Sequence, residues 1–294
     1  MNQGCLCIFG EVLFDHFPDG NRILGGAPFN VAWHLQAFGQ APCFISRIGA
    51  DAQGEAVTVA MEEWGMRTDA LQVDPVLPTG RVDVRFTDGE PSYVIAEHCA
   101  YDAIDADVVN VDCRLLYHGS LSLREMTSKQ AVEMLRSGEP EILFIDINLR
   151  PPWWQLSQIE AMLENADWVK LNSDELDKLD KSAKNSSKRG KELIDRYGLK
   201  GLLVTHGSAG AEAITATGDH VSIKPGNDIE VVDTVGAGDA FASVMIMGLA
   251  NDWPLETALS RAQAFASGVV ANQGATVNDM QFYRNYLQDW KQEV

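Results

Sequence analysis

The sequence is short of positive charge. Its 294 residues contain 23 Lys and Arg against 42 Asp and Glu, which gives a formal net charge of −19 at pH 7. Extended surfaces that bind nucleic acid or anionic membranes need clustered Lys and Arg, so this balance excludes both. Any phosphate that the protein binds must be held locally, by backbone amides and metal ions.

Long apolar runs are also missing, and cysteines are few. No segment approaches the roughly 18 apolar residues that cross a bilayer, and the sequence does not open on a basic segment followed by an apolar one, so we expect a cytoplasmic protein. The five cysteines lack the paired spacing of a zinc site. Cys5 and Cys7 lie in an apolar run, and we expect the cysteines to be reduced.

The two common nucleotide-binding loops are absent. The sequence has no G-x-G-x-x-G, and Gly236-Ala-Gly238 lacks the third glycine because residue 241 is Phe. The only Gly-Lys pair, Gly190-Lys191, is followed by Glu192 rather than Ser or Thr. These absences exclude a dinucleotide fingerprint and a P-loop.

What the sequence does contain is an alternation of short apolar runs and segments with helical periodicity. This pattern predicts an α/β fold with a mostly parallel sheet flanked by helices on both faces. The expected strands are residues 5–9, 41–48, 115–118, 142–147, 169–171 and 201–206, with a late hairpin of residues 211–217 and 221–223. The expected helices include residues 27–38, 53–64, 128–136, 156–165, 174–179, 191–197 and 254–270, and residues 182–190 are expected to form a charged surface loop.

Residues 79–101 break this alternation. Residues 81–86 alternate in polarity, Asp88-Gly89 is a hairpin turn signal, and residues 92–96 form a second strand. Together with residues 11–24 this hairpin is expected to form a small β-sheet lid over a core of residues 1–10, 25–78 and 102–294. Two further interpretations are a hairpin on the edge of the main sheet and a surface that pairs two copies of the chain.

The stretch from Val231 to Leu249 carries the clearest chemical signal. A β-branched approach is followed by Gly236-Ala-Gly238 and an apolar helical run, with Asp239 near the helix start. The glycines let backbone amides approach an anion, and a carboxylate in such a place suggests a base that takes a proton from an attacking hydroxyl. The alternative, on this stretch alone, is that Asp239 is only an N-cap of the helix.

Further polar groups follow other predicted strands, where ligands bind in parallel sheets. Asp146-Ile-Asn-Leu-Arg150 places an acid, an amide and a guanidinium on alternate residues. Asn172 and Glu175 have the i, i+3 spacing that could face a hydrated metal, although an N-cap and a first-turn acid would show the same pattern. Thr205-His-Gly-Ser-Ala-Gly210 is another loop rich in amides.

Two segments stand near opposite ends of the chain, Gly25-Gly-Ala-Pro-Phe-Asn-Val-Ala with Gly39, and Asp233-Thr-Val-Gly-Ala-Gly-Asp-Ala-Phe241. They resemble the two signatures of the PfkB (ribokinase-like) family of carbohydrate kinases. The three groups described above, at residues 146–150, 172–175 and 205–210, stand between these two segments in the same order as in the family. Gly10-Glu-Val-Leu-Phe-Asp15 and Gly-Gly-Ala-Pro-x-Asn resemble the fructokinase branch most.

The resemblance implies a role for each matching position, and a cavity between core and lid for the reaction. Asp239 matches the catalytic base, and the amides of Gly236, Ala237 and Gly238 match the anion hole. The substrate contacts would be Asp15, Gly26, Asn30 and Arg150, and the ATP contacts Asn172, Thr205, Gly207, Gly210 and Asn272. Glu175 matches the residue tied to Mg²⁺, through water, and Asp233 the side chain beside a K⁺ site that only some members need.

The implied activity is transfer of the γ-phosphoryl group of ATP to a primary hydroxyl of a small sugar, with fructose first among the candidates. The alternatives are a 2-keto-3-deoxygluconate kinase, a nucleoside or riboside kinase, and a regulatory relative that binds sugar without turnover. Arg81, Arg85, Tyr93 and His98 of the lid are candidate specificity residues. A homodimer through the lid is a further expectation.

Overall fold

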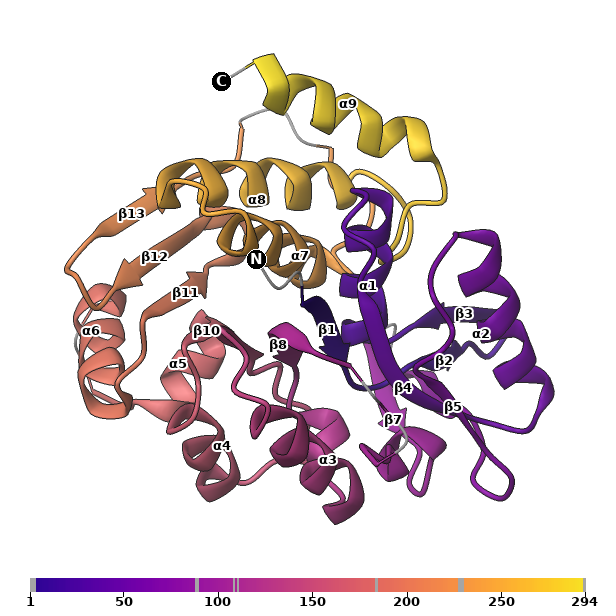
Figure 1. Ribbon diagram of the computed structural model, residues 1–294. Coiled ribbons are helices and arrows are strands. Elements are labelled where there is room, and N and C mark those ends of the chain that lie inside the picture. The colour runs from indigo at the N-terminus through magenta and orange to yellow at the C-terminus, as the bar shows by residue number, and fades with distance from the viewer. Residues whose placement is uncertain are drawn as a thin grey trace.

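The computed structural model describes residues 4–87, 90–107, 109, 111–182, 185–226 and 230–292. Within them, the strands of the main sheet lie in the order β13-β12-β11-β10-β9-β8-β1-β4-β5 (Figure 1). Their bounds are β1 Cys5–Phe9, β4 Cys43–Gly49, β5 Leu71–Asp74, β8 Cys113–His118, β9 Ile142–Asp146, β10 Trp168–Asn172, β11 Gly201–Thr205, β12 Ala211–Thr215 and β13 His220–Ile223. The strands from β5 to β11 in this order pair in parallel, and β12 and β13 add an antiparallel edge. The prediction of a mostly parallel sheet is confirmed.

Helices cover both faces of this sheet (Figure 1). One face carries α1 (Ala27–Ala37), α2 (Ala52–Glu63), α7 (Ala237–Ala250), α8 (Leu255–Val269) and α9 (Met280–Gln292), and the other carries α3 (Met126–Arg136), α4 (Leu156–Leu163), α5 (Ser173–Leu179) and α6 (Ser186–Tyr197). Alternate residues of the central strand β1 therefore enter different cores. Ile8 packs with the first set of helices, and Cys7 and Phe9 pack with the second. Burial on both faces explains why the central strands are mostly apolar.

One predicted loop is a helix over half its length. The sequence predicts a charged surface loop over residues 182–190, but α6 begins at Ser186. The side chain of Asn185 caps the helix by accepting a hydrogen bond from the backbone N–H of Lys188 at 3.0 Å. Gly190 packs against Leu202 and Ile214, where a β-carbon would lie 2.5 Å from an Ile214 methyl. The sequence predicts a loop here because charged residues dominate the segment and the apolar face of α6 is narrow.

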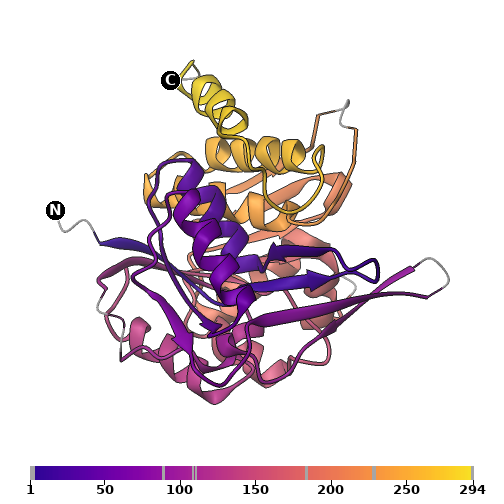
Figure 2. The same ribbon diagram turned by 90° about the vertical axis from the view of Figure 1, so that its right-hand side faces the viewer.

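A separate four-stranded sheet has the order β3-β2-β6-β7 and projects from the core (Figure 2). Its strands are β2 Leu13–His16, β3 Arg22–Gly25, β6 Gly80–Thr87 and β7 Glu90–Ile95. Val82 and Val84 of β6 are buried, whereas Arg81 and Arg85 are exposed, as the alternation predicts. The alternative of a hairpin on the edge of the main sheet is wrong, because β6 pairs with β2 of the small sheet. The predicted turn Asp88-Gly89 lies outside the described residues.

The expectation that the cysteines are reduced is wrong for two of them. Cys7 of β1 and Cys113 of β8 form a disulfide, with 5.6 Å between their Cα atoms. Cys43 and Cys99 are buried free thiols, and Cys5 is half-buried. Cys7 and Cys113 are 106 residues apart in sequence, so only the pairing of β1 with β8 brings their sulfurs together.

We expect a thiol titration to report this pairing. The denatured, unreduced protein should react with three equivalents of a thiol reagent, from Cys5, Cys43 and Cys99, and the reduced protein with all five cysteines. A Cys7→Ser variant is the control, because it should free Cys113 and titrate four thiols without reduction. Five reactive thiols in the unreduced protein would contradict the disulfide.

Candidate active site

The site is built around the turn that opens α7. Gly236 is the N-cap of this helix and has a φ of 78°, a left-handed conformation that favours glycine. A β-carbon on Gly236 would lie 2.4 Å from the Cα of Ala275, so no side chain fits there. The amides of Gly236, Ala237 and Gly238 thus stand at the positive end of a 14-residue helix. This turn has the geometry of an anion-binding site.

Asp239 lies in the first turn of α7 and does not cap it. Its Oδ2 accepts a hydrogen bond of 2.8 Å from the Nδ2 of Asn30 in α1, 209 residues away in sequence. Burial, reinforced by the negative charge of Asp146, raises the pKa of the Asp239 carboxyl to about 6, against the opposing effects of Asn30, Lys170 and Arg150. Such a carboxylate is ionised at neutral pH and accepts protons better than an ordinary Asp.

Asn30 and Gly26 approach Asp239 from the start of α1. Gly26 is the N-cap of α1 with a φ of 113°, and a β-carbon there would lie 2.6 Å from the carbonyl oxygen of Glu11. The loop after β1 and the start of α1 therefore pack backbone to backbone. Asn30 is buried, and its Oδ1 has no hydrogen-bond partner among the described residues. That acceptor is available to a ligand beside Asp239.

A buried ion pair lies beneath the turn. Lys170 of β10 and Asp146 of β9 are neighbours in the sheet register, and Lys170 Nζ lies 2.7 Å from Asp146 Oδ2. Burial alone would lower the pKa of Lys170, but the carboxylate of Asp146 raises it above its usual value. A β-carbon on Gly238 would be 3.2 Å from Lys170 Nζ, so the ammonium group directly underlies the turn. Lys170 is not among the predicted site residues, although a lone charge inside an apolar strand is a readable signal.

Arg150 lies in the loop after β9, within electrostatic range of three carboxyl groups. The sequence predicts that Asp146, Asn148 and Arg150 alternate along a strand and so face one side. This is wrong beyond Asp146, because β9 ends there and Asn148 has a φ of 40°. Arg150 is exposed, and its positive charge lowers the pKa values of Glu11, Asp15 and Asp239 against the larger effect of their burial. Arg150 therefore supplies positive charge to a group of three acids.

Asp15 and Glu11 complete that group. Asp15 is half-buried in β2 of the small sheet, and burial raises its pKa. Glu11 follows β1 directly and is buried, and burial raises its pKa to about 7. Glu11 is not among the predicted site residues, although an acid directly after a buried parallel strand stands where such sheets bind ligands.

Asn172 and Glu175 form a capping box at the start of α5. Asn172 Oδ1 accepts from the N–H of Glu175, and Glu175 Oε2 accepts from the N–H of Asn172, both at 2.9 Å. Glu175 Oε1 accepts from the N–H of Leu149 at 2.7 Å. Each carboxylate oxygen keeps one lone pair, which fits contact with a hydrated ion. Among the described residues no group of three or more His, Cys, Asp or Glu could hold a metal ion.

Asp233 links the turn to the segment after α8. Its Oδ1 accepts from the N–H of Val235 and its Oδ2 from the N–H of Gly274, both at 3.0 Å. The carboxylate thus fixes the loop that leads into Gly236. Both oxygens keep lone pairs for a cation, so the residue fits the monovalent site that the resemblance implies.

A cavity of about 590 Å³ opens between the segment after β13 and helix α8. Its walls include Ile223, Lys224, Ser260, Gln263, Ala264, Gly268 and Tyr286. Two predicted nucleotide contacts adjoin it. Gly210 packs on Ile223, where a β-carbon would lie 2.0 Å from the carbonyl oxygen, and Asn272 Nδ2 donates to the Gly268 carbonyl at 2.8 Å. Thr205 is the last residue of β11, and Gly207 precedes Gly210 in the loop after this strand. Sequence reasoning missed the cavity wall itself, whose residues share no motif.

The chain is similar to known carbohydrate kinases along most of its length. The model of the pfkB family of carbohydrate kinases matches residues 9–281. A probable chloroplastic fructokinase-6 of Arabidopsis thaliana is 29% identical over 288 residues, covering 88% of this chain and 74% of that protein. A 5-dehydro-2-deoxygluconokinase of Listeria monocytogenes is 26% identical over 276 residues, covering 87% of this chain and 83% of that protein.

The fold has solved counterparts. A fructokinase from Xylella fastidiosa with bound ATP superposes with a TM-score of 0.83 at 23% identity, covering 98% of this chain and 99% of that chain. At this identity the likeness establishes the fold alone, and it agrees with the two sheets described above.

The turn at Gly236 generates a stability prediction with a matched control. Gly236→Ala should lower the free energy of unfolding by about 2–4 kcal/mol, because it combines a left-handed alanine with a collision against Ala275. Gly39 has a similar φ of 76°, and a β-carbon placed on it would have no atom within 4 Å, so Gly39→Ala should cost only about 1 kcal/mol. Denaturant unfolding measures both. Equal costs would show that the packing against Ala275 is not tight.

Proposed function

This chain belongs to the pfkB family of carbohydrate kinases, and on that premise we propose that it phosphorylates a primary hydroxyl of fructose with ATP. The observation that carries the proposal is Asp239, a carboxylate beside a helix N-terminus, held by Asn30 and raised in pKa to about 6. The fructokinase names among its relatives support the choice of sugar.

In the proposed reaction, Asp239 takes the proton of the sugar hydroxyl as its oxygen attacks the γ-phosphorus. A new O–P bond forms, the bond between the γ-phosphorus and the β-phosphate oxygen breaks, and ADP leaves. Asn30 donates to Asp239 Oδ2, which leaves Oδ1 to accept the proton. Gly26, Asn30, Asp15 and Arg150 would hold the sugar.

Charge on the transferred group would be met by the turn below it. The amides of Gly236, Ala237 and Gly238 would donate to the phosphoryl oxygens, and Lys170 adds positive charge directly beneath Gly238. Because phosphoryl transfer has a loose transition state, such positioning and charge stabilisation contribute more than the proton transfer.

The nucleotide is assigned to the cavity beside Gly210 and Asn272, with Thr205 and Gly207 near its phosphates. Asn172 and Glu175 would position Mg²⁺ through water, and the ion would neutralise phosphate charge. Asp233 is the proposed side chain for K⁺. Residues 11–24 and 79–101, which contain the small sheet, would act as a lid over the sugar.

Among sugars, the local charge favours a neutral one. Glu11, Asp15 and Asp239 are three carboxyl groups near Arg150, so the carboxylate of 2-keto-3-deoxygluconate would face net repulsion. Arg85, the lid residue considered for contact with a carboxylate, is exposed, and Arg81 pairs with Asp83 at 3.2 Å. A nucleoside substrate and a regulatory relative without turnover remain the alternatives to this proposal.

Two further expectations go with the kinase. Tyr93 and Val94 on β7 are 56% and 43% exposed, one on each face of the small sheet, and these exposed apolar side chains support the proposed homodimer through the lid. Among the described residues no helix is long and apolar enough to span a membrane. We propose the cytoplasm as its location.

Replacing the base tests the assignment. Asp239→Asn keeps the shape and should lower kcat by about 10²- to 10⁴-fold in a coupled ADP-release assay with fructose, with the KM for ATP little changed. Asp195→Asn, on the exposed face of α6, is the matched control and should retain full activity. Full kcat in Asp239→Asn would remove Asp239 from the mechanism.

The pKa of Asp239 predicts the pH dependence. The base must be ionised to accept a proton, so kcat/KM should be constant above pH 7 and fall about tenfold per pH unit below pH 6. Burial and the Asp146 charge are the causes of this raised value. Initial rates between pH 4.5 and 8.5, with thermal unfolding measured at each pH, check it. A rate that stays constant down to pH 5 in folded protein would contradict the raised pKa.

A further inference from the structure

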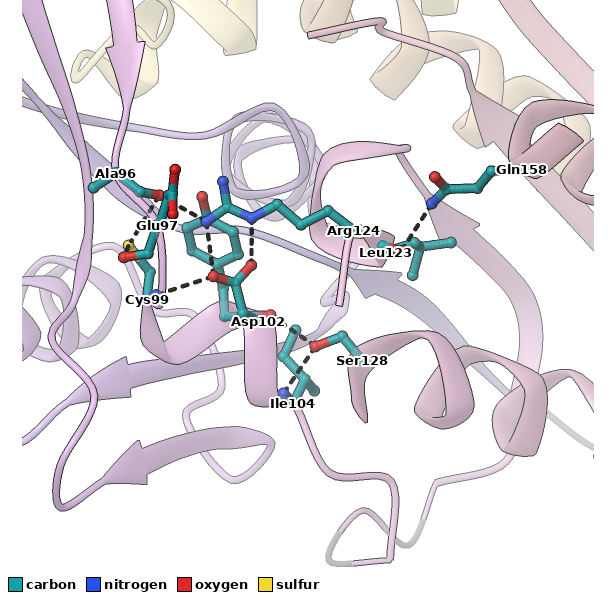
Figure 3. Close-up of polar contacts among 10 residues, drawn as sticks. Ala96, Glu97, Cys99, Asp102, Ile104, Leu123, Arg124, Ser128 and Gln158 are labelled. Carbon is teal, nitrogen blue, oxygen red and sulfur yellow. Dashed lines mark hydrogen bonds and ion pairs between the residues drawn. The ribbon is translucent and has the colours of Figure 1, made fainter. Parts of the chain in front are cut away.

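A cluster of buried polar side chains lies beside the proposed sugar site, where the chain leaves β7 and re-enters the core. It consists of Glu11, Tyr101, Asp102 and Ser122, which are buried, and Arg124, whose side chain is 4% exposed. We call these five residues the polar cluster. Hydrogen bonds from neighbouring side chains fix the backbone around the polar cluster. Ser128 Oγ accepts from the N–H of Ile104 and donates to the carbonyl of Tyr101, and Gln158 donates to the carbonyl of Leu123 (Figure 3).

Within the described residues, two of the three nitrogens of the Arg124 guanidinium donate hydrogen bonds, and the third does not. Its Nε and Nη2 donate to the two oxygens of Asp102, both at 2.7 Å, and Nη2 also donates to the carbonyl of Ala96 at 2.7 Å (Figure 3). Its guanidinium stacks between the rings of Tyr101 and Trp153, 5.1 and 4.6 Å from their centroids. Nη1 is buried and has no hydrogen-bond partner among the described residues.

In the described part of the chain, Glu11 has a buried acceptor without a partner, which complements the unpaired donor of Arg124. Its Oε2 is buried without a partner among the described residues, and so are the hydroxyl groups of Tyr101 and Ser122. The carboxyl of Glu11 lies within electrostatic range of Arg124 on one side and of Arg150 and Asp239 on the other. The Arg124 guanidinium lies over the ring of Tyr101, and a β-carbon on Gly10, next to Glu11, would lie 3.2 Å from Ser122 Oγ. The polar cluster is therefore continuous with the residues around Asp239.

Buried donors and acceptors without partners are costly, and native proteins nearly always satisfy them with water or a ligand. Here a strong donor and a strong acceptor are left over together, and a hydroxyl group can satisfy both because it accepts and donates at once. We propose that Glu11 and Arg124 form an additional hydroxyl-binding pair of the sugar site, in which Arg124 Nη1 donates to, and Glu11 Oε2 accepts from, one hydroxyl of the substrate.

The charges of the polar cluster select the chemical class of that group. Asp102 neutralises Arg124 through two hydrogen bonds, so the guanidinium offers a directed N–H without net positive charge. The carboxyl of Glu11 offers no positive charge. A carboxylate or phosphate placed here would meet an acid and a neutralised guanidinium, whereas a neutral hydroxyl satisfies both orphans. The inference rests on the proposed sugar kinase function and names the residues that favour neutral sugars over sugar acids.

The test is a thermodynamic cycle between side chain and hydroxyl. Binding of the accepted sugar and its monodeoxy analogues is measured by titration calorimetry without ATP, for the wild type, Glu11→Met and Arg124→Met. One monodeoxy analogue should bind the wild type roughly 10- to 100-fold more weakly than the parent sugar. That penalty should disappear in both variants. Their KM for ATP should stay within about twofold of the wild type.

Arg47→Met is the matched control. Arg47 pairs with Asp74 at 2.8 Å, donates to the carbonyl of Ala103 and, like Arg124, has a buried nitrogen, Nε, without a partner among the described residues. It lies in β4, and no interaction joins it to Glu11 or Asp239 in the described part of the chain. The deoxy penalty should persist in this control. If Arg124→Met does not fold, Glu11→Met carries the test.

The pair would be refuted if no monodeoxy analogue loses its penalty in Glu11→Met, or if Arg47→Met removes the penalty equally. A penalty that vanishes only for a nucleoside analogue would keep the pair and overturn fructose as the sugar. Undiminished kcat in Asp239→Asn would overturn the proposed mechanism and leave this binding cycle unaffected, so the two failures are distinguishable.

Discussion

The buried ion pair of Lys170 and Asp146 is the interaction on which the rest of the site depends. It joins β9 to β10 at the centre of the parallel sheet, with both side chains less than 10% exposed. An unpaired charge in this place would be strongly destabilising, so removing either partner should cost stability. The ammonium lies beneath the turn at Gly238. Burial raises the pKa of Asp239, and the two charges of the pair act on it in opposite directions, Asp146 raising and Lys170 lowering the pKa. One pair thus acts on both the proposed anion site and the proposed base.

Around this pair, the topology brings together residues from distant parts of the chain. Parallel strands end at a common edge, so the segments after β1, β9, β10 and β11 all reach one side of the sheet. The starts of α1 and α7 meet there through the hydrogen bond between Asn30 and Asp239. The small sheet contributes Asp15, and the polar cluster with Arg124 lies where that sheet joins the core. A substrate bound between these elements, as proposed, would contact both sheets.

Sequence patterns predicted the parallel sheet, the small sheet and the turn at Gly236, because apolar periodicity and glycine positions are local signals. Contacts across the sheet left no such signal. The Cys7–Cys113 disulfide, the Lys170–Asp146 pair and the pairing of Arg124 with Asp102 all depend on which strands and loops become neighbours. Glu11 and Lys170 could have been marked as charges in or after apolar strands. The N-terminal half of α6 was missed because its charged face dominates the composition.

We propose that this site transfers the γ-phosphoryl group of ATP to a sugar hydroxyl. The most direct measurement is ADP release from ATP and Mg²⁺, with and without K⁺, over a panel of fructose, other hexoses, 2-keto-3-deoxygluconate and nucleosides, with the products identified by mass spectrometry. We expect one neutral sugar, fructose, to give ADP and sugar monophosphate in equal amounts. ATP turnover without any phosphorylated acceptor, or phosphorylation of the sugar acid alone, would contradict it.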